Sequence, residues 1–487
     1  MTLKTNTSLV RFALATSTLA AFSTLCRADE PAVETAPAIV ASPESLAAWE
    51  YDFSAADEAL LDEIQLGCFN YFWNVVGEGA CLAKDKTSDT VCSIAAVGFQ
   101  LSSLPIGVER GWITREEGRK RALTVLRALT ARSDNKKFGI YLHFLDERNG
   151  GQPDYSRTRH PYELTASTVD HALLQAGVMT AAAYFGDEVA EAAEPIIADA
   201  NWQKMLDEKS GLLTMGWKAS TTRGVNGPGA LTGAMWHIAS DEERLIYFLA
   251  VGSPTEEHAI EPAAYYRLKR AVKQHEEMPP YVVSWNGSMF TYFFSHCWID
   301  YRHFGPDDPT KFGVDGPSVD WFENSRRATL THRARCIEES DKLPTLSENR
   351  WGLAPCSYRD HYFVHEVRPN LSDKDIWFDG VVPPYGAGSA IMFAPAQSMA
   401  ALREYRSLEN DRGDPLVWSD PASGGYGFKD SFSLDPPYGN DDYLGIDQGP
   451  LLLAIENART GLIWQLFMQH PVAKRAVEKL DLQARPR

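Results

Sequence analysis

The spacing of apolar residues predicts a chain built mainly from helices. In residues 56–76, Leu61, Ile64 and Cys68 recur at the three–four spacing of one helix face. Strand patterns are sparse and short, so the sequence favours an all-α fold. We expect further helices at 114–132, 162–185, 241–252, 262–277, 318–338, 396–410 and 449–469.

The sequence shows a clear N-terminal signal for the helix predicted at 114–132. Thr114 is followed three residues later by Glu117, which is the pattern of an N-terminal capping box. Ala122, Val125 and Leu129 then lie on one side of the predicted helix. We therefore expect this helix to begin at Thr114 and to bury that face.

Long loops rich in Trp, Tyr, Gly and Asp separate the predicted helices. Helix pairs that alternate with such loops over more than 400 residues indicate helical hairpins that close into a ring. Residues 29–50 are rich in Ala, Pro and acids and predict a disordered linker. No break in composition follows it, so we expect residues 51–487 to form a single domain.

The first residues have the pattern of a signal peptide over 1–28. Lys4 and Arg11 supply a basic region, 12–22 is a short apolar run, and Ala28 is a small residue at a cleavage point. An apolar run of this length is too short to span a bilayer. We expect a periplasmic or secreted protein that is not inserted in the membrane after signal removal.

Six cysteines remain after the predicted signal peptide. An even number in an oxidising compartment permits disulfides, with Cys81 and Cys92 as the most local pair, but buried free thiols fit equally well. The chain contains neither CxxC nor HExxH, so we expect no metal and no cofactor. The six are Cys68, Cys81, Cys92, Cys297, Cys336 and Cys356.

The charge and the aromatic content narrow the class of partner. A net charge of −18 argues against nucleic acid and anionic membrane surfaces. The chain has 13 Trp, 19 Tyr and 22 Phe, and flat rings stack on sugars, although most rings in any protein belong to the core. We therefore expect an oligo- or polysaccharide partner and a monomer.

Hydrolysis of a glycosidic bond needs two carboxyl groups whose environments separate their pKa values. A first candidate is the acidic segment Asp241-Glu242-Glu243 after Ser240, which opens a predicted helix behind an aromatic Gly-rich loop. The alternative is structural, with Ser240 as N-cap and Glu243 as its capping-box partner.

A second candidate lies near the C-terminus. Asp430 and Asp447 occur in stretches where glycines alternate with aromatic residues, including Tyr426, as suits backbone that approaches a ligand closely. The alternative is an ordinary loop in which Asp447 caps the last long helix.

Two further places carry polar groups in apolar surroundings. Asp170 and His171 interrupt the apolar helix 162–185, where a buried polar group must be paired or functional unless both lie on a solvated stripe. His296 stands among aromatic residues, where a hydrogen-bonded core histidine is the usual role.

Taken together, eight regions in sequence order resemble the glucoamylase-like family, which includes the endo-β-1,2-glucanases of glycoside hydrolase family 144 and related enzymes. The resemblance extends from about residue 60 to 470. The segments are FNYFW at 69–73, GVERG and ITRE at 107–116, FFSH at 293–296, RCI at 335–337, ENRWGL at 348–353, AGSAIMFAP at 387–395, GFKDSF at 427–432, and GIDQGP with IENARTGLIW within 445–464.

The resemblance implies an (α/α)6 toroid with long aromatic-rich loops and an inverting hydrolase acting on β-1,2-glucan. It implies Glu242 as the general acid and Asp430 as the base, with Asp447 in reserve. The sequence departs from the family at Asp170, where the family usually has Glu, and at the two residues before Glu242, which are usually Trp-Asn. The residues expected to bind substrate are Asp170, His171, Trp236, Trp285, His296, Trp351 and Tyr426.

Three alternatives stay open at this point. A polysaccharide lyase on the same scaffold would use Tyr162, His171 and Arg223, although the negative charge argues against a polyuronate substrate. A second alternative is a non-catalytic glycan-binding protein. The third is a transglycosylase or phosphorolytic variant of the same site.

Overall fold

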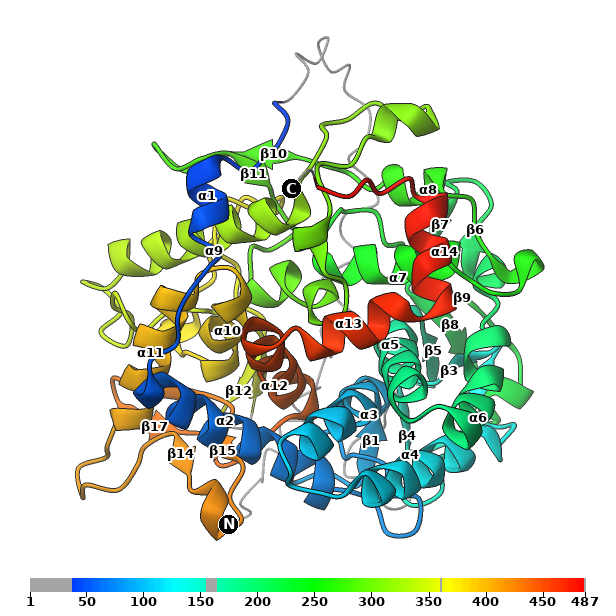
Figure 1. The fold of residues 1–487 in the computed structure, drawn as a ribbon, viewed down its shortest axis with the longest axis horizontal. Coiled ribbons are helices and arrows are strands. Elements are labelled where there is room, and N and C mark those ends of the chain that lie inside the picture. Colours follow the sequence, from blue (N-terminus) through cyan, green and yellow to red (C-terminus); the bar gives the residue numbers. More distant parts are fainter. Residues whose placement is uncertain (1–36, 155–163, 360, 486–487) are drawn as a thin grey trace, which may run out of the picture.

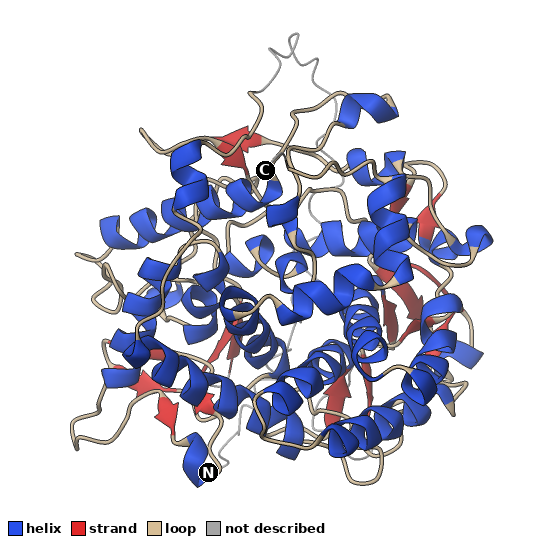
Figure 2. Ribbon diagram, in the orientation of Figure 1, coloured by secondary structure: helices blue, strands red, loops and turns tan. Residues whose placement is uncertain are grey.

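The computed structural model describes residues 37–154, 164–359 and 361–485 of the chain. Its regular structure is mainly helical, with short strands between the helices (Figure 2). The α-helices of this part are α1 Pro43–Ala47, α2 Ala55–Asn74, α3 Ile94–Glu109, α4 Arg115–Thr130, α5 Thr168–Phe185, α6 Asp187–Ala198, α7 Asp241–Val251, α8 Ala263–Tyr266, α9 Trp321–Glu338, α10 Pro384–Ser389, α11 Pro395–Ser407, α12 Gly445–Arg459, α13 Leu462–Gln469 and α14 Pro471–Lys479.

The strands of the described residues form antiparallel two-stranded pairs and one three-stranded sheet, β5-β8-β9. Each is only two to four residues long, as the sparse strand patterns predict. They are β1 Val91–Ser93, β2 Lys136–Lys137, β3 Ile140–Tyr141, β4 Phe144–Asp146, β5 Thr165–Ser167, β6 Leu206–Asp207, β7 Leu212–Leu213, β8 Gly216–Ala219, β9 Gly229–Leu231, β10 Val272–Lys273, β11 Tyr281–Val282, β12 Cys356–Tyr358, β13 His361–Phe363, β14 Trp418–Ser419, β15 Gly427–Phe428, β16 Phe432–Leu434 and β17 Pro437–Gly439.

Six helical segments of the described chain form a closed inner ring. Each packs against the next in the order α3, α5, α7, η6–η7, α10 and α12, and α12 packs against α3 again. The fourth member is a pair of short 3₁₀ helices, η6 (Met289–Tyr292) and η7 (Ser295–Cys297). The outer helices α2, α4, α6, α8, α9 and α11 each precede one inner member in the chain. This alternation is the predicted (α/α)6 toroid.

The inner helices are apolar on all sides because neighbours surround them. All residues of α3 from Ile94 to Gly107 are buried. It crosses α5 closely: a Cβ added to Gly177 would lie 1.9 Å from the carbonyl oxygen of Gly98, and one added to Gly98 would lie 2.2 Å from that of Leu173. The two glycines therefore allow the backbones of α3 and α5 to touch.

The ring has two different ends. The starts of neighbouring inner helices lie together at one end: an ideal Cβ on Gly445, which opens α12, would lie 2.5 Å from the Cβ of Ala96 near the start of α3. At the other end, α13 and α14 cross the ring (Figure 1). Gly252, just after α7, has the carbonyl oxygen of Val472 in α14 2.5 Å from its ideal Cβ position, which places α14 against the C-terminal end of that inner helix.

The predicted helices at 56–76, 114–132, 241–252, 318–338 and 396–410 are confirmed as α2, α4, α7, α9 and α11 within a few residues. The capping box also forms: the Thr114 hydroxyl accepts the amide of Glu117, and the Glu117 carboxylate accepts the amide of Thr114.

Three helix predictions need correction. Residues 449–469 form two helices, because Gly461 adopts a left-handed conformation between α12 and α13. Residues 262–277 contain only the short α8, because the following chain pairs with Ile238 and with β11. In 162–185 the helix begins at Thr168 after β5, and residues 162 and 163 lie outside the described residues.

The N-terminal segment from residue 37 is also not the predicted disordered linker. Ile39 is fully buried and pairs with Val319, and its amide donates to the carbonyl of Ser318 at 2.9 Å. Ser42 caps α1, and the Ser45 hydroxyl donates to Glu323 at 3.1 Å. An apolar anchor and a capped helix turn hold this segment on α9. The predicted signal peptide and residues 29–36 lie outside the described residues.

The six cysteines after the predicted signal peptide are free thiols, so the pairing of Cys81 with Cys92 is wrong. Cys92 lies in β1 and is fully buried, while Cys81 lies in a turn with positive φ and is partly exposed. Within the described ranges, no helix is both long enough and apolar enough to cross a membrane.

Candidate active site

Acidic residues gather at the end of the ring where the inner helices begin. Asp170, Glu242 and Asp447 each lie in the first turn of an inner helix, namely α5, α7 and α12. The helix dipole favours negative charge at this position. Asp430 reaches the same place from the loop between β15 and β16.

Glu242 is partly exposed in a surrounding that disfavours its charge. Burial raises its pKa well above the ordinary value, and the nearby carboxylates of Glu243 and Asp170 raise it further. No described residue donates a hydrogen bond that would favour the ionised form. Glu242 therefore holds its proton at a pH at which an ordinary glutamate has lost it.

The acids on either side of Glu242 have structural contacts. Asp241 is fully buried, forms an ion pair with Arg244, and accepts the amide of Ser295 at 3.2 Å. Glu243 accepts the hydroxyl of Ser240, and burial raises its pKa to about 7. The capping contact considered as an alternative for this segment is thus present, but it uses Glu243 and leaves Glu242 facing the other acids.

Asp430 and Asp447 form a carboxyl pair, and each is only 2% exposed. Their side chains hydrogen-bond to each other, which requires one of the two to carry a proton. The amide of Ser357 donates to Asp430 Oδ2 at 2.5 Å and favours the ionised form there. The Tyr385 hydroxyl donates to the carbonyl of Pro355 at 2.9 Å, and its contact with Asp447 lowers the pKa of that carboxyl without offsetting burial and the charge of Asp430.

The pKa shifts of Asp430 and Asp447 also indicate one ionised and one protonated carboxyl group. Burial and the hydrogen-bonded, charged Asp430 raise the pKa of Asp447 well above its ordinary value. Burial raises the pKa of Asp430 to about 6, and the contacts with Asp447 and Ser357 oppose the rise. Near neutral pH the pair therefore consists of ionised Asp430 and neutral Asp447.

Asp170 and Asp85 lie between Glu242 and this pair. Asp170 accepts the Ser167 hydroxyl at 2.5 Å, and its Oδ1 lies 3.4 Å from Nε2 of His143. Burial raises the pKa of Asp85 to about 6, with His143 opposing and Asp170 among the contributors to the rise.

Asp85 in turn connects to Asp447, because its charge helps to raise the pKa of Asp447. The carbonyl of Asp85 accepts the amide of Gly445 at 2.9 Å and the hydroxyl of Tyr71 at 3.1 Å. These contacts fix the loop of Asp85 beside the start of α12. The acids thus form a series across the ring, from Glu242 through Asp170 and Asp85 to Asp447 and Asp430.

Three residues predicted to bind substrate are not brought to this series. His171 is fully buried between Tyr141 and Trp202, and burial lowers its pKa to about 3. It follows Asp170 directly on α5, so its side chain points to another side of the helix.

His296 and Trp351 are core residues as well, each with no exposed surface. His296 packs against Phe322 and Phe393, and its Nε2 lies 3.0 Å from the Ser325 hydroxyl. Their aromatic surroundings are those of a helix-packed core, and side chains without exposed surface cannot contact a sugar.

The other three predicted binding residues keep some accessible surface. Trp236 is 9% exposed and donates from Nε1 to the Thr168 hydroxyl at 2.8 Å, at the start of α5. Trp285 is partly buried beside the loop of Ser372. Tyr426 packs edge-on against Tyr71, whose hydroxyl holds the Asp85 loop.

Three site residues were missed from the sequence: Asp85, His143 and Tyr362. Asp85 and His143 contribute the contacts just described. Tyr362, on β13, is 51% exposed, and the charges of Asp447 and Asp430 act on its hydroxyl. All three lie in loops or short strands, where no helical spacing marks them.

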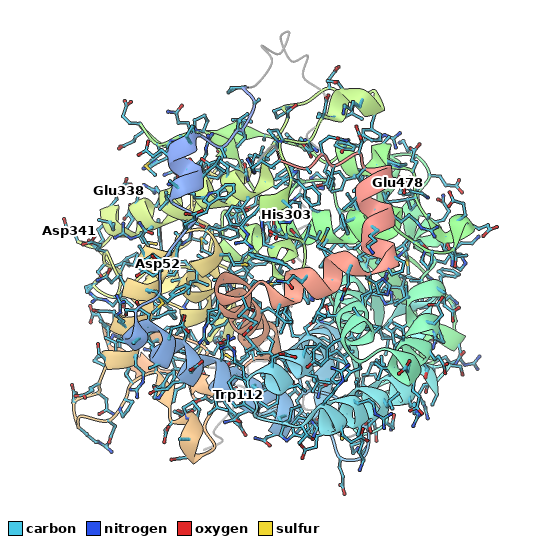
Figure 3. All side chains as sticks on the ribbon, in the orientation of Figure 1. Asp52, Trp112, His303, Glu338, Asp341 and Glu478 are labelled. Carbon is cyan, nitrogen blue, oxygen red and sulfur yellow. The ribbon has the colours of Figure 1, made fainter. Side chains whose placement is uncertain are left out.

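Other surface features lie elsewhere. Hollows lined by His303 and by Trp112 are at the C-terminal ends of α12 and α3, on the face turned to the viewer in Figure 3. Within the described ranges, His275, Glu276 and Glu338 bring ligand atoms within 4.8 Å of one another. Glu338 is bonded to Arg335 at the end of α9, so this group belongs to the outer layer.

The ring, with its acids at the N-termini of inner helices, is an (α/α)6 toroid with a candidate active site at one end. Residues 235–471 match the Glycoamylase family model, described as "Putative glucoamylase". The predicted resemblance to the glucoamylase-like family is thereby confirmed for the part of the chain that contains Glu242, Asp430 and Asp447.

Comparison with individual proteins agrees. The chain is 27% identical over 458 residues to the exo-β-1,2-glucooligosaccharide sophorohydrolase (non-reducing end) of Parabacteroides distasonis, covering 88% of this chain and 58% of that protein. The chain thus spans less than two thirds of this curated relative.

Solved structures with the same fold include two of nearly equal similarity. The endo-β-1,2-glucanase of Chitinophaga pinensis, in complex with sophorotriose and glucose, is 22% identical with a TM-score of 0.71 and covers 88% of this chain and 98% of that one. A "putative glucoamylase" from Bacteroides caccae is 25% identical with a TM-score of 0.72 and covers 88% of this chain and 100% of that one.

Proposed function

We propose that the protein is a glycoside hydrolase that cleaves β-glucan, and specifically β-1,2-glucan, by inversion. The observation that carries the proposal is the different surroundings of two carboxyl groups at one end of the ring: Glu242 lies near the carboxylates of Glu243 and Asp170, which raise its pKa, whereas Asp430 accepts the Ser357 amide, which favours its ionised form. The β-1,2 linkage is supported by the named activities of the sophorohydrolase and of the Chitinophaga pinensis glucanase.

Glu242 acts as the general acid. Its raised pKa keeps the proton on the carboxyl until the glycosidic oxygen of the leaving group needs it. The nearby Glu243 and Asp170 disfavour a negative charge on Glu242, which keeps it an acid near neutral pH.

Asp430 acts as the base that takes a proton from water, directly or through a substrate hydroxyl. The Ser357 amide holds its charge in place, and neutral Asp447 donates to it. Asp447 is thus a positioning residue for the base. Asp170, in the first turn of α5, and Trp236, which donates to Thr168 at the start of that helix, contact the sugar next to Glu242.

We infer inversion from the resemblance and from the different charged neighbours of the two groups. The acids that act on Glu242 are Glu243 and Asp170, whereas those that act on Asp430 are Asp447 and Asp442. A retaining enzyme needs its two carboxyls in close proximity, while an inverting enzyme needs space for a water molecule between base and sugar.

The acid is tested by comparing Glu242→Gln with Glu188→Gln. Each is the second residue of its helix, Glu242 in inner helix α7 and Glu188 in outer helix α6. The side chain of Glu188 is exposed. We expect the first variant to lose about 100- to 10,000-fold in kcat on linear β-1,2-glucan, the range typical of a lost general acid. Glu188→Gln should keep wild-type activity, and equal rates for the two variants would remove Glu242 from the mechanism.

Secretion follows from the predicted signal peptide and stays a proposal. It is tested by expressing the full chain in a Gram-negative host and sequencing the N-terminus of the protein in the periplasmic fraction. We expect the mature chain to begin near residue 29, and an intact N-terminus in the cytoplasm would contradict this.

A further inference from the structure

The hairpin β12–β13 positions both Asp430 and Tyr362. Tyr362 pairs with Ser357 across the hairpin. The amide of Ser357 donates to Asp430, and its carbonyl accepts from the Ser431 hydroxyl and, at 2.8 Å, from the Asn440 amide. The backbone of Ser357 thus faces away from β13, which makes Ser357 and Tyr362 a non-hydrogen-bonded pair with closely spaced side chains.

The exposure of Tyr362 is unusual for its size. In the described ranges, the large apolar side chains with extensive exposed surface are Tyr362 at 51%, Val40, Phe138 and Ile337. Val40 lies on the N-terminal segment, Phe138 in the turn between β2 and β3, and Ile337 on outer helix α9. Tyr362 is therefore the exposed aromatic side chain that stands beside the carboxyl pair.

The two ends of Tyr362 have different surroundings. Burial of its hydroxyl and the charges of Asp447 and Asp430 raise the pKa of Tyr362 well above the ordinary value, with Cys356 and Asp85 also contributing. The hydroxyl therefore stays protonated and lies among the acids of the site. Half of the side chain is nevertheless exposed, so a ligand can reach it.

A sugar can stack on an exposed aromatic ring that lies beside the acids of the site. The C–H face of a pyranose packs on such a ring, and covering the ring removes apolar area from water. The backbone of Tyr362 is held by the hairpin through its pairing with Ser357. The ring is thus oriented before a ligand arrives, which reduces the entropy lost on binding.

We propose that Tyr362 is a substrate-binding residue whose ring forms the platform for the glucosyl unit next to Asp430. The inference rests on the glucan hydrolase function proposed above and adds a sugar subsite on the base side of the reaction centre. Tyr362 sets where the sugar lies relative to Asp430, and it thereby affects affinity more than the proton transfers.

The test compares Tyr362→Ala and Tyr362→Phe with Phe138→Ala, a matched loss of an exposed ring in the turn between β2 and β3. Binding of short sophoro-oligosaccharides is measured by calorimetry in the Glu242→Gln background, so that the probe is not consumed. Steady-state kinetics on linear β-1,2-glucan are measured with Glu242 intact. Should Tyr362→Ala fail to fold, Tyr362→Leu removes the aromatic ring while it keeps the bulk.

We expect Tyr362→Ala to weaken binding about tenfold and to raise KM in proportion, as the loss of one covered ring predicts. Tyr362→Phe and Phe138→Ala should bind as the Glu242→Gln background does. Unchanged binding in Tyr362→Ala, or an equal loss in Phe138→Ala, would overturn the platform while leaving the hydrolase function standing. If the wild type neither binds nor cleaves the glucan, the proposed function itself fails and the platform with it.

Discussion

At the scale of single residues, the site works by giving similar carboxyl groups different surroundings. Asp430 receives the Ser357 amide and keeps its charge, whereas Asp447 stands beside that charge and keeps a proton. Glu242 is partly exposed but surrounded by other acids. The same chemical group thus supplies a base, a neutral donor and an acid.

The assignment of the base predicts a difference between Asp430→Asn and Asp447→Asn. We expect the first to lose about 100- to 10,000-fold in kcat, because asparagine cannot accept the proton of water. Asparagine at 447 can still donate to Asp430, as the neutral Asp447 does, so that variant should keep most of the activity. Exposed Asp441→Asn serves as the control. The reverse order of effects would make Asp447 the base.

The pH dependence follows from the same groups. The base must be ionised, so kcat/KM should fall as the pH decreases through the pKa of Asp430 at about 6. The acid must be protonated, so kcat/KM should fall again as the pH rises through the raised pKa of Glu242. A pH–rate profile on β-1,2-glucan measures both limbs. Full activity at pH 4 to 5 would contradict an Asp430 base in this environment.

Sequence reasoning placed Glu242, Asp430, Asp447 and Asp170 in one site because the resemblance marks their positions. It could not find Asp85 or His143, since loop residues meet the other acids only through tertiary packing. It misplaced His296 for a related reason: a histidine among aromatic residues has the same pattern in a core as beside a sugar.

At the scale of elements, the first turns of the inner helices carry the chemistry, and neighbouring residues of one turn have separate tasks. In α7, Asp241 binds Arg244 and the Ser295 amide, Glu243 binds Ser240, and Glu242 between them faces the site. The start of the helix is held from both sides, so the acid between is fixed in position.

This arrangement has a cost in stability that depends on pH. The fold raises the pKa of Glu243 to about 7, compared with about 4.3 in the unfolded chain. Protonated Glu243 therefore contributes fully to the free energy of unfolding below about pH 4.3, and this contribution is lost as the pH rises through 7. Glu243→Gln cannot ionise. We expect it to be more stable than wild type by about 1–3 kcal/mol at pH 8, with a smaller difference at pH 5.

Thermal melts of wild type, Glu243→Gln and the exposed control Glu188→Gln at both pH values check this expectation. The control should melt with the wild type at each pH. A Glu243→Gln protein that is less stable than wild type at pH 8 would show that the charge of Glu243 stabilises the fold.

Most outer helices could be predicted because each buries one face and shows helical periodicity, as in α2 and α4. Inner helices such as α3 are surrounded by neighbours and apolar on all sides, so no face stands out. The fourth inner member, η6–η7, is an aromatic segment without helical spacing, and only its position between α7 and α10 shows that it completes the ring.

At the scale of the whole molecule, the toroid brings the N-termini of its inner helices together and closes the other end with α13 and α14 (Figure 1). Acids from residues 85 to 447 meet at the first end although the chain separates them widely. The fold class and the closure into a ring were predictable from the alternation of helices and loops, and the (α/α)6 count from the resemblance. The series of acids across the ring needed the structure, because it depends on which helices are neighbours.

The most direct test of the account is mass-spectrometric analysis of products from linear β-1,2-glucan, with β-1,3- and β-1,4-glucans as parallel substrates. The wild-type protein should release short sophoro-oligosaccharides from the β-1,2-glucan alone, and Glu242→Gln should release none. Products from another linkage only would contradict the proposed substrate. No products from any glucan would contradict the assignment of Glu242 and Asp430 to glycosidic cleavage.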